Sequence, residues 1–327
     1  MKSLVGIFTK QLEEAMEIGG NAALNPCDKK ISNVVITGLG GSGIGGKIVS
    51  QLVADNCLVP ITINNTYDLP GFVREDTLVI ASSFSGNTEE TLYAVEEAQK
   101  KGAEIAMITS GGKFLELAKA NNYNHIVLPD GKSPRAMLTY SLTQQFFLLS
   151  QYGLISDEFK KEIPAAINLL NENLEAIKSE AEMVASKLKD KTAVIYSEAK
   201  YEGVAVRFRQ QLNENAKVLC WHHVLPEMNH NEVVGWAGGK DEYAVVVFRN
   251  EDDFYRTQKR LDITKEVASA KTKTYIEINS KGTSRIQRAM YLILMGDWIS
   301  VYLAELNQVD PIEVRVIDHL KAELAKI

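Results

Sequence analysis

The sequence has few cysteines and no excess of positive charge. Its 327 residues include only three cysteines, Cys27, Cys57 and Cys220, with no CxxC spacing. An odd number of widely separated cysteines indicates core thiols in a reducing cytosol, not a disulfide framework or a zinc site. Acidic residues outnumber basic ones by 42 to 36, which gives a net charge of −6. Nucleic-acid binding needs clustered positive charge to neutralise phosphates, so this balance argues against a nucleic-acid partner.

The chain also lacks a long hydrophobic run. Its longest apolar stretch, residues 290–304, is interrupted by Asp297 and is shorter than a bilayer span. The N-terminal segment is amphipathic and interrupted by charges, unlike a signal peptide. The composition, 45% hydrophobic and 24% charged, is that of a globular protein, and 327 residues suggest two domains. We therefore expect a soluble, cytoplasmic, two-domain protein with no membrane partner.

Short apolar runs alternate with helical patterns, as in βαβ units around a parallel sheet. The runs are continuously apolar, as expected for strands covered on both faces. The predicted strands of the first half are residues 34–37, 58–64, 77–81, 103–109 and 125–128, with helices at 45–54 and 89–101. Helical periodicity then extends from 139 to about 190, and strands resume at 193–196, 243–248 and 274–278. The sequence predicts two doubly wound, flavodoxin-like α/β domains, residues 1–152 and 153–327, the second a looser copy of the first.

A glycine-rich loop follows the first predicted strand. Residues 38–43, GLGGSG, match G-x-G-x-x-G, which is typical of dinucleotide binding. Dinucleotide binding also requires an acidic residue at the end of the second strand, and residues 63–66 supply none before Asp68. The G-K-[ST] of a nucleotide P-loop is absent, because Ile48 follows Gly-Lys. A structural alternative is that the glycines let the next helix pack close to the sheet.

A second loop, residues 82–91 (SSFSGNTEET), follows a strand and begins a helix. Hydroxyls and backbone N–H groups at a helix N-terminus suit a dianion, assisted by the helix dipole. Capping is the alternative, because Asn87 and Glu90 have the spacing of a capping box. One capping residue is enough for that role, however, and the loop carries three more hydroxyls, on Ser83, Ser85 and Thr88. We interpret the loop as a phosphomonoester site that it shares with Ser42 of the glycine loop.

This pattern resembles a sugar isomerase (SIS) domain, in which a Ser/Thr-rich loop after a parallel strand holds a sugar phosphate. The tandem arrangement resembles the bifunctional phosphoglucose/phosphomannose isomerase family over nearly the whole chain. The most specific motifs are NENAK at residues 213–217 and EMNHNE at 227–232, in that order. The others are GLGGSGIGG, SSFSGNTEET, Ser133-Pro134-Arg135, and Asp310-Pro311 followed by Leu320-Lys321.

The resemblance implies an aldose–ketose isomerase that interconverts glucose 6-phosphate, and mannose 6-phosphate, with fructose 6-phosphate. Matched residue by residue, its phosphate-binding hydroxyls are Ser42, Ser83, Ser85 and Thr88, with loop backbone from Gly40 and Gly41. Its catalytic residues are the carboxylate Glu214, the ring-opening histidine His230, and the cations Arg135 and Lys321. Some family members have a threonine, linked to handling mannose, where this chain has Val314. The resemblance therefore supports the glucose activity more fully than the mannose activity.

The resemblance also implies a homodimer in which the histidine-bearing loop reaches the partner's site. His230 would then complete the active site of the other subunit. The apolar helix predicted over residues 291–306 would be core in a monomer, and the resemblance favours an interface for it instead.

The chemistry of this reaction fits the residues. Isomerisation moves a proton between C1 and C2 through a cis-enediol, and one carboxylate such as Glu214 can take and return it. Neither a metal nor another cofactor is needed. A positive charge such as that of Arg135, at the carboxyl edge of the sheet, would stabilise the enediolate. A histidine titrating near neutral pH can protonate the ring oxygen, and His230 lies in a polar segment with two other histidines, at a spacing that fits no common zinc site.

Structural alternatives remain open for each of these residues. Glu214 at a helix end and Lys321 on the predicted terminal helix, residues 312–325, could simply face solvent, and Arg135 could be a surface arginine. A non-catalytic SIS regulator would need the serine loop alone, but such proteins usually carry a DNA-binding domain, for which this chain has no room. A glucosamine-phosphate synthase would normally add a glutaminase domain with an N-terminal cysteine, whereas position 2 is Lys.

Overall fold

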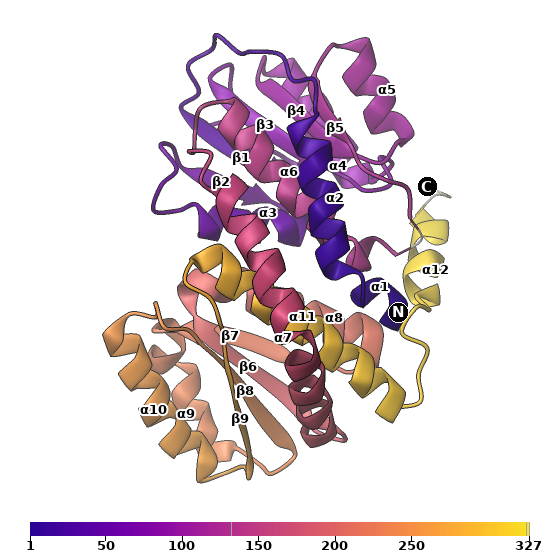
Figure 1. The fold of residues 1–327 in the computed structure, drawn as a ribbon. Coiled ribbons are helices and arrows are strands. Elements are labelled where there is room, and N and C mark those ends of the chain that lie inside the picture. The colour runs from indigo at the N-terminus through magenta and orange to yellow at the C-terminus, as the bar shows by residue number, and fades with distance from the viewer. Residues whose placement is uncertain (132, 325, 327) are drawn as a thin grey trace. The chain divides into compact units, whose positions relative to one another are not determined.

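A computed structural model describes residues 1–131, 133–324 and 326 and divides the chain into two compact units (Figure 1). The first unit comprises residues 6–172 and 281–290, and the second comprises 1–5, 173–280 and 291–327. Two of the four passages between the units lie inside long helices, α7 (Phe159–Leu188) and α11 (Arg285–Leu306). The sequence-based boundary at residues 152 and 153 lies instead directly after helix α6 (Leu138–Gln151).

The first unit is built on a parallel five-stranded sheet with the order β2-β1-β3-β4-β5. Its strands are β1 (Asn33–Thr37), β2 (Ile61–Asn64), β3 (Thr77–Ser82), β4 (Glu104–Thr109) and β5 (Asn124–Val127). This is the order of a flavodoxin-like doubly wound sheet. The second strand begins at Ile61, three residues later than predicted, because Pro60 has no N–H to donate to a ladder and Leu58 is largely exposed.

Helices cover both faces of this sheet. Alternate strand residues, including Val79 and Met107, form a core with α4 (Glu89–Lys100) and α5 (Gly112–Ala120). The other face packs against α3 (Gly40–Leu52) and α6, and α2 (Phe8–Gly20) lies against α6. A Cβ on Gly46 of α3 would lie 2.7 Å from the side chain of Ile36, so close helix packing does explain one glycine of the GLGGSGIGG motif.

The second unit repeats this topology with a parallel four-stranded sheet of order β7-β6-β8-β9. Its strands are β6 (Thr192–Glu198), β7 (Trp221–Leu225), β8 (Tyr243–Arg249) and β9 (Thr274–Asn279). By order in the sheet, β6 corresponds to β1 and β8 to β3. The predicted doubly wound fold is therefore confirmed in both units. The strand β7 was not predicted, because this edge strand is polar and only its last residue is buried.

Helices lie on both faces of the second sheet as well (Figure 1). On one face α8 (Glu202–Ala216) places Phe208 5.7 Å from the ring of Phe248 in β8. On the other face α10 (Tyr255–Ser269) contributes Leu261 and Ala268 to the core. The remaining helices are α1 (Lys2–Val5), α9 (Glu232–Gly235) and α12 (Arg315–Leu324), with four short 3₁₀ turns in the described residues. The predicted terminal helix corresponds to α12, and its residue Ala325 lies outside the described residues.

Helix α11 is part of the protein core. Among the described residues it alone is long and apolar enough to cross a membrane, but 83% of its most apolar window is buried inside the protein. Asp297, in the middle of this helix, is fully enclosed and accepts hydrogen bonds from Arg207 (3.1 Å) and Gln211 (2.8 Å) of α8. Most apolar side chains of residues 291–306 are already covered within the chain, with Leu306 an exception, so this helix is core and not the interface that the resemblance favours.

Candidate functional site

The glycine loop forms the first turn of α3. The helix begins at Gly40, not at Gly45 as predicted, and Gly40 has a positive φ of 54°. A Cβ on Gly43 would lie 2.4 Å from the carbonyl oxygen of Gly38, so the turn requires glycine there. The first N–H groups of a helix have no acceptor within the helix, so the backbone of Gly40 and Gly41 can serve an anion.

The serine loop meets the glycine loop at the same edge of the first sheet. The backbone N–H of Phe84 donates to Ser42 Oγ at 3.2 Å, which ties the two loops together. Within the serine loop, the hydroxyls of Ser83 and Thr88 share a hydrogen bond of 2.8 Å. Ser85 is exposed, and its hydroxyl accepts from the N–H of Asn87 at 3.3 Å. The structure therefore brings the four predicted phosphate-binding hydroxyls into two adjoining loops of one unit.

The capping-box alternative for this loop is wrong. Helix α4 begins after Thr88, and within the described residues no side chain caps its N-terminus. The Asn87 side chain instead donates to the carbonyl of Ser85 (3.2 Å) and accepts from the N–H of Lys113 (3.2 Å). The N-terminal N–H groups of α4 thus lack the side-chain acceptor that a cap would provide.

Arg135 lies beside the glycine loop, on the 3₁₀ turn Pro134–Ala136. Its Cα is 3.7 Å from the position a Cβ would take on Gly41. The residue is only 7% exposed, so the surface-arginine alternative is wrong.

A cleft of about 460 Å³ opens next to this turn and is lined by Ser85, Ser110, Gly111, Gly112 and Pro134, among others. Ligands of doubly wound sheets bind at this carboxyl edge. A hollow of about 530 Å³ between Ser32 and Phe72 lies at the opposite edge.

Glu214 lies in the last turn of α8 and is half-buried. Its neighbours in NENAK hold this helix end in place. Asn213 donates to the carbonyl of Val218 (2.8 Å), and Asn215 donates to Ser300 Oγ (2.9 Å). Lys217, in the left-handed conformation with φ of 58°, donates from Nζ to the carbonyls of Glu214 (2.5 Å) and Glu313 (2.6 Å). The motif therefore fixes the backbone on both sides of the carboxylate.

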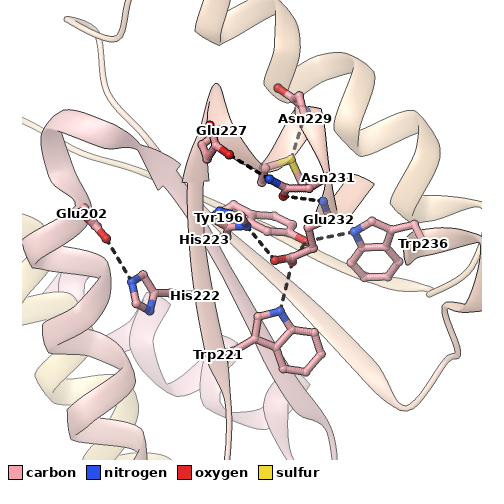
Figure 2. A network of polar contacts seen from close by, with 11 residues as sticks. Tyr196, Glu202, Trp221, His222, His223, Glu227, Asn229, Asn231, Glu232 and Trp236 are labelled. Carbon is pink, nitrogen blue, oxygen red and sulfur yellow. Dashed lines mark hydrogen bonds and ion pairs between the residues drawn. The ribbon is translucent and has the colours of Figure 1, made fainter. Parts of the chain in front are cut away.

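Two histidines of the histidine-rich segment pair with carboxylates (Figure 2). His222 Nε2 lies 3.5 Å from Glu202, and His223 Nδ1 lies 2.9 Å from Glu232. His230 ends the 3₁₀ turn Glu227–His230 and is exposed. Among the described residues its ring makes no hydrogen bond or ion pair. Of the three histidines, His230 is the one whose imidazole is available to a ligand.

Lys321 lies on α12, where residues 315–324 are all exposed. This is the environment that the solvated-lysine alternative predicts.

The predicted site residues are divided between the two units. The first unit contains Ser42, Ser83, Ser85, Thr88 and Arg135, and the second contains Glu214, His230 and Lys321. Among residues 1–131, 133–324 and 326, no three histidine, cysteine or acidic side chains cluster as metal ligands would.

The corresponding edge of the second sheet carries carboxylates in place of hydroxyls. Glu198 ends β6, and its buried carboxylate accepts from the N–H of Phe254, the N-cap of α10, at 2.7 Å. Asp253, in the loop after β8, is also buried and accepts from the N–H of Asn250 at 2.9 Å. Burial, with a smaller contribution from nearby Glu198, raises the pKa of Asp253 to about 7.

Two family models match the two halves of the chain. Residues 29–155 match the SIS domain, and residues 177–324 match the bacterial phospho-glucose isomerase C-terminal SIS domain. Over 329 aligned residues the chain is 40% identical to the bifunctional phosphoglucose/phosphomannose isomerase of Caldicellulosiruptor bescii, covering 97% of each protein. The chain belongs to the bifunctional phosphoglucose/phosphomannose isomerase family. A member of this isomerase family from Aquifex aeolicus is 36% identical over 90% of each chain.

Solved structures agree with this fold. The C-terminal domain of glucosamine-fructose-6-phosphate aminotransferase from Francisella tularensis superimposes with a TM-score of 0.77, covering 94% of this chain and 96% of that domain. At 14% identity this likeness shows the shared fold alone. The fold of this isomerase family member is therefore a tandem of SIS domains, as the motifs predicted.

Two residues, Ser110 of the first unit and Glu232 of the second, were not predicted from the sequence. Ser110 follows β4 at the edge that carries both loops, and its hydroxyl donates to the carbonyl of Phe84 at 2.6 Å. Its position after a strand was a usable signal, since all carboxyl ends of a parallel sheet share one edge. Glu232 accepts hydrogen bonds from three side chains of the second unit, which no local sequence pattern reveals.

The serine loop depends on glycine at position 86. Gly86 has a φ of 69°, and a Cβ there would lie 1.8 Å from the carbonyl oxygen of Gly111. Gly86→Ala should lower the free energy of unfolding by about 3 kcal/mol or more, because backbone strain and a backbone clash add. The matched control is Gly153→Ala, at φ of 67° with open space, which should cost about 1 kcal/mol. Urea unfolding measures both variants, and equal losses would contradict the clash.

Proposed function

We propose that this protein is an aldose–ketose isomerase that interconverts glucose 6-phosphate, and mannose 6-phosphate, with fructose 6-phosphate. The observation that carries the proposal is the pair of hydroxyl-bearing loops beside a buried arginine, in a chain 40% identical to a named phosphoglucose/phosphomannose isomerase. The reaction moves one proton through a cis-enediol and requires no redox cofactor. The protein acts in the cytoplasm.

The phosphate group of the substrate binds at the carboxyl edge of the first sheet. The hydroxyls of Ser42, Ser83, Ser85 and Thr88 and the N-terminal N–H groups of α3 and α4 all donate to its oxygens. The hydrogen bond between Ser83 and Thr88 would exchange for bonds to phosphate. These contacts anchor the sugar, and the phosphate takes no part in the chemical step.

Ring opening and proton transfer use the remaining residues. His230 protonates the ring oxygen, the bond between C1 and that oxygen breaks, and the C1 hydroxyl releases its proton to water, which yields the open-chain aldehyde. Glu214 removes the C2 proton to form the cis-enediol, the C2 hydroxyl passes its proton to O1, and Glu214 returns the first proton to C1 to form the ketose. The cations of Arg135 and Lys321 stabilise the negative charge that develops on the enediolate oxygens.

The same intermediate accounts for two aldose substrates. Glucose and mannose 6-phosphate differ only in configuration at C2, and C2 is planar in the enediol. A single carboxylate can therefore serve both epimers, provided that the site lets a proton reach either face of C2. The valine at position 314 makes the mannose activity the less supported of the two.

The alternative of a non-catalytic sugar-phosphate sensor is less well supported. A sensor requires the phosphate loops but gives no role to the motif that fixes the backbone around Glu214. Curated relatives that cover 90% or more of the chain are named as isomerases. Direct measurement of fructose 6-phosphate conversion separates the two functions.

Glu214→Gln should abolish isomerisation, because an amide cannot carry the proton. The expected loss in kcat is about 10²–10⁴-fold, the usual contribution of a general base. Exchange of the substrate C2 proton with deuterated solvent, followed by NMR, should stop as well. Glu266→Gln, at an exposed position on α10, is the matched control and should retain full activity. More than about a tenth of wild-type kcat in Glu214→Gln would remove Glu214 from this role.

Removing the hydroxyls of the serine loop should weaken binding. Ser85→Ala combined with Thr88→Ala should raise KM about tenfold or more with little change in kcat, since phosphate contacts persist from ground state to transition state. Ser50→Ala, which removes a half-buried hydroxyl from the far end of α3, is the control. An unchanged KM together with unchanged inhibition by inorganic phosphate would place the phosphate elsewhere.

We further propose a homodimer in which His230 completes the active site of the partner subunit. Mixing inactive Glu214→Gln with inactive His230→Ala should then restore activity on subunit exchange. About half of the dimers are hybrids with one intact site each, so activity should approach about a quarter of wild type. Light scattering checks the dimer, and fluorescence transfer between labelled subunits checks exchange. If exchange occurs without any return of activity, His230 acts within its own chain.

A further inference from the structure

The residues on both sides of His230 are held in place by contacts within the second unit. Met228 is fully buried, and Asn229 donates to Thr264 Oγ1 of α10 at 3.1 Å. Asn231 accepts from the N–H of Glu232 at 2.6 Å and donates to Glu227 at 2.9 Å. Among residues 227–232, all of which the structure describes, His230 alone is exposed and has no polar partner. An ordered segment that leaves one imidazole uncommitted suits the presentation of that imidazole to a substrate.

Glu232 connects this segment to the sheet (Figure 2). Its Oε1 accepts from the hydroxyl of Tyr196 at 2.6 Å and from the indole N–H of Trp221 at 3.1 Å. Its Oε2 lies 2.9 Å from His223 Nδ1. Tyr196 is on β6, and Trp221 and His223 are on β7. Through this one carboxylate, the residue two positions after His230 is bonded to the two neighbouring strands β6 and β7.

The partners of Glu232 are themselves fixed. Tyr196 is fully buried and also accepts from the indole N–H of buried Trp236 at 3.0 Å. Burial, followed by the hydrogen bond to Glu232, raises the pKa of the Tyr196 hydroxyl well above its usual range. Tyr196 thus stays protonated and serves as a permanent donor to the carboxylate. Hydrogen bonds to a charged acceptor are stronger than those between neutral groups, so several of them strongly restrain the position of the segment.

We propose that Glu232 is a positioning residue that holds the His230 imidazole where it can open the sugar ring. The proposal rests on the proposed function, because it assumes that His230 is the ring-opening acid. Glu232 makes no contact with His230 in the described residues, so it acts through the backbone that both residues share. Displacement of a catalytic group by about 1 Å can cost about 10²-fold in rate.

The test compares a substrate that must open with one that cannot close. Glucose 6-phosphate is cyclic, whereas its analogue without the 4- and 5-hydroxyl groups has no hydroxyl positioned to form a stable ring. Glu232→Ala should lower kcat for glucose 6-phosphate about 10–10²-fold and leave kcat for the analogue within about twofold of wild type. Glu232→Gln should recover most of the activity, because an amide oxygen still accepts from Tyr196 and Trp221 and the amide N–H can donate to His223.

Two further variants distinguish a positioning effect of Glu232→Ala from a general loss of folding. Trp221→Phe removes a single donor from a partly exposed position and should show the same preference for the analogue at a smaller magnitude, about threefold. Glu242→Ala removes an exposed carboxylate just before β8 and should leave both substrates unaffected. Equal losses on both substrates in Glu232→Ala and Trp221→Phe, or no loss on either, would overturn the positioning role.

His230→Ala separates this proposal from the proposed function. If His230→Ala leaves kcat for the analogue unchanged and Glu232→Ala lowers it, the result supports ring opening by His230 and contradicts the positioning role of Glu232. If His230→Ala lowers both substrates equally or neither, the assignment of ring opening to His230 fails, and the positioning role fails with it.

Discussion

The parallel pairing of β1 with β3 is the constraint on which the phosphate loops depend. The two strands are neighbours and run in the same direction, so the loops that follow them leave the sheet at the same edge. The hydrogen bond from Phe84 N–H to Ser42 Oγ then joins loops that are far apart in sequence. Gly43 and Gly86 allow close backbone contacts that a side chain would prevent. Hydroxyls, helix N-termini and a buried arginine gather at one edge as a result.

Much of this architecture could be predicted from the sequence, because most strands are buried on both faces. β3 and β8 read as uninterrupted apolar runs, since nearly every one of their residues is covered. β7 could not be predicted, because an edge strand keeps polar residues such as His222 and His223 on its partly exposed surface. The early start of α3 was also missed. Glycine disfavours helices, but here its small size lets the first turn lie close to neighbouring backbone.

The site could be predicted only in part, and for different reasons at different residues. The hydroxyls of the serine loop were recognisable because they follow a strand and precede a helix. Glu214 and His230 were identified through motif resemblance, since a half-buried glutamate and an exposed histidine carry no local signal. Asn87 illustrates the opposite error, because its spacing suggested a cap while its side chain bonds within the loop and to Lys113. Glu232 depends on Tyr196, a partner 36 residues away, which no short pattern encodes.

The carboxylates at the edge of the second sheet give the duplicated fold an asymmetry. Where the first sheet offers hydroxyls and uncapped helix N–H groups, the second already directs the N-terminal N–H of Phe254 to the carboxylate of Glu198. A phosphate dianion at that edge would meet the buried carboxylate of Glu198 and a backbone donor that this carboxylate already occupies. The second copy of the fold therefore carries its own internal anion. The duplicated chain is accordingly expected to bind one phosphate per polypeptide at these loops, not two, and its second sheet is left to support other parts of the protein.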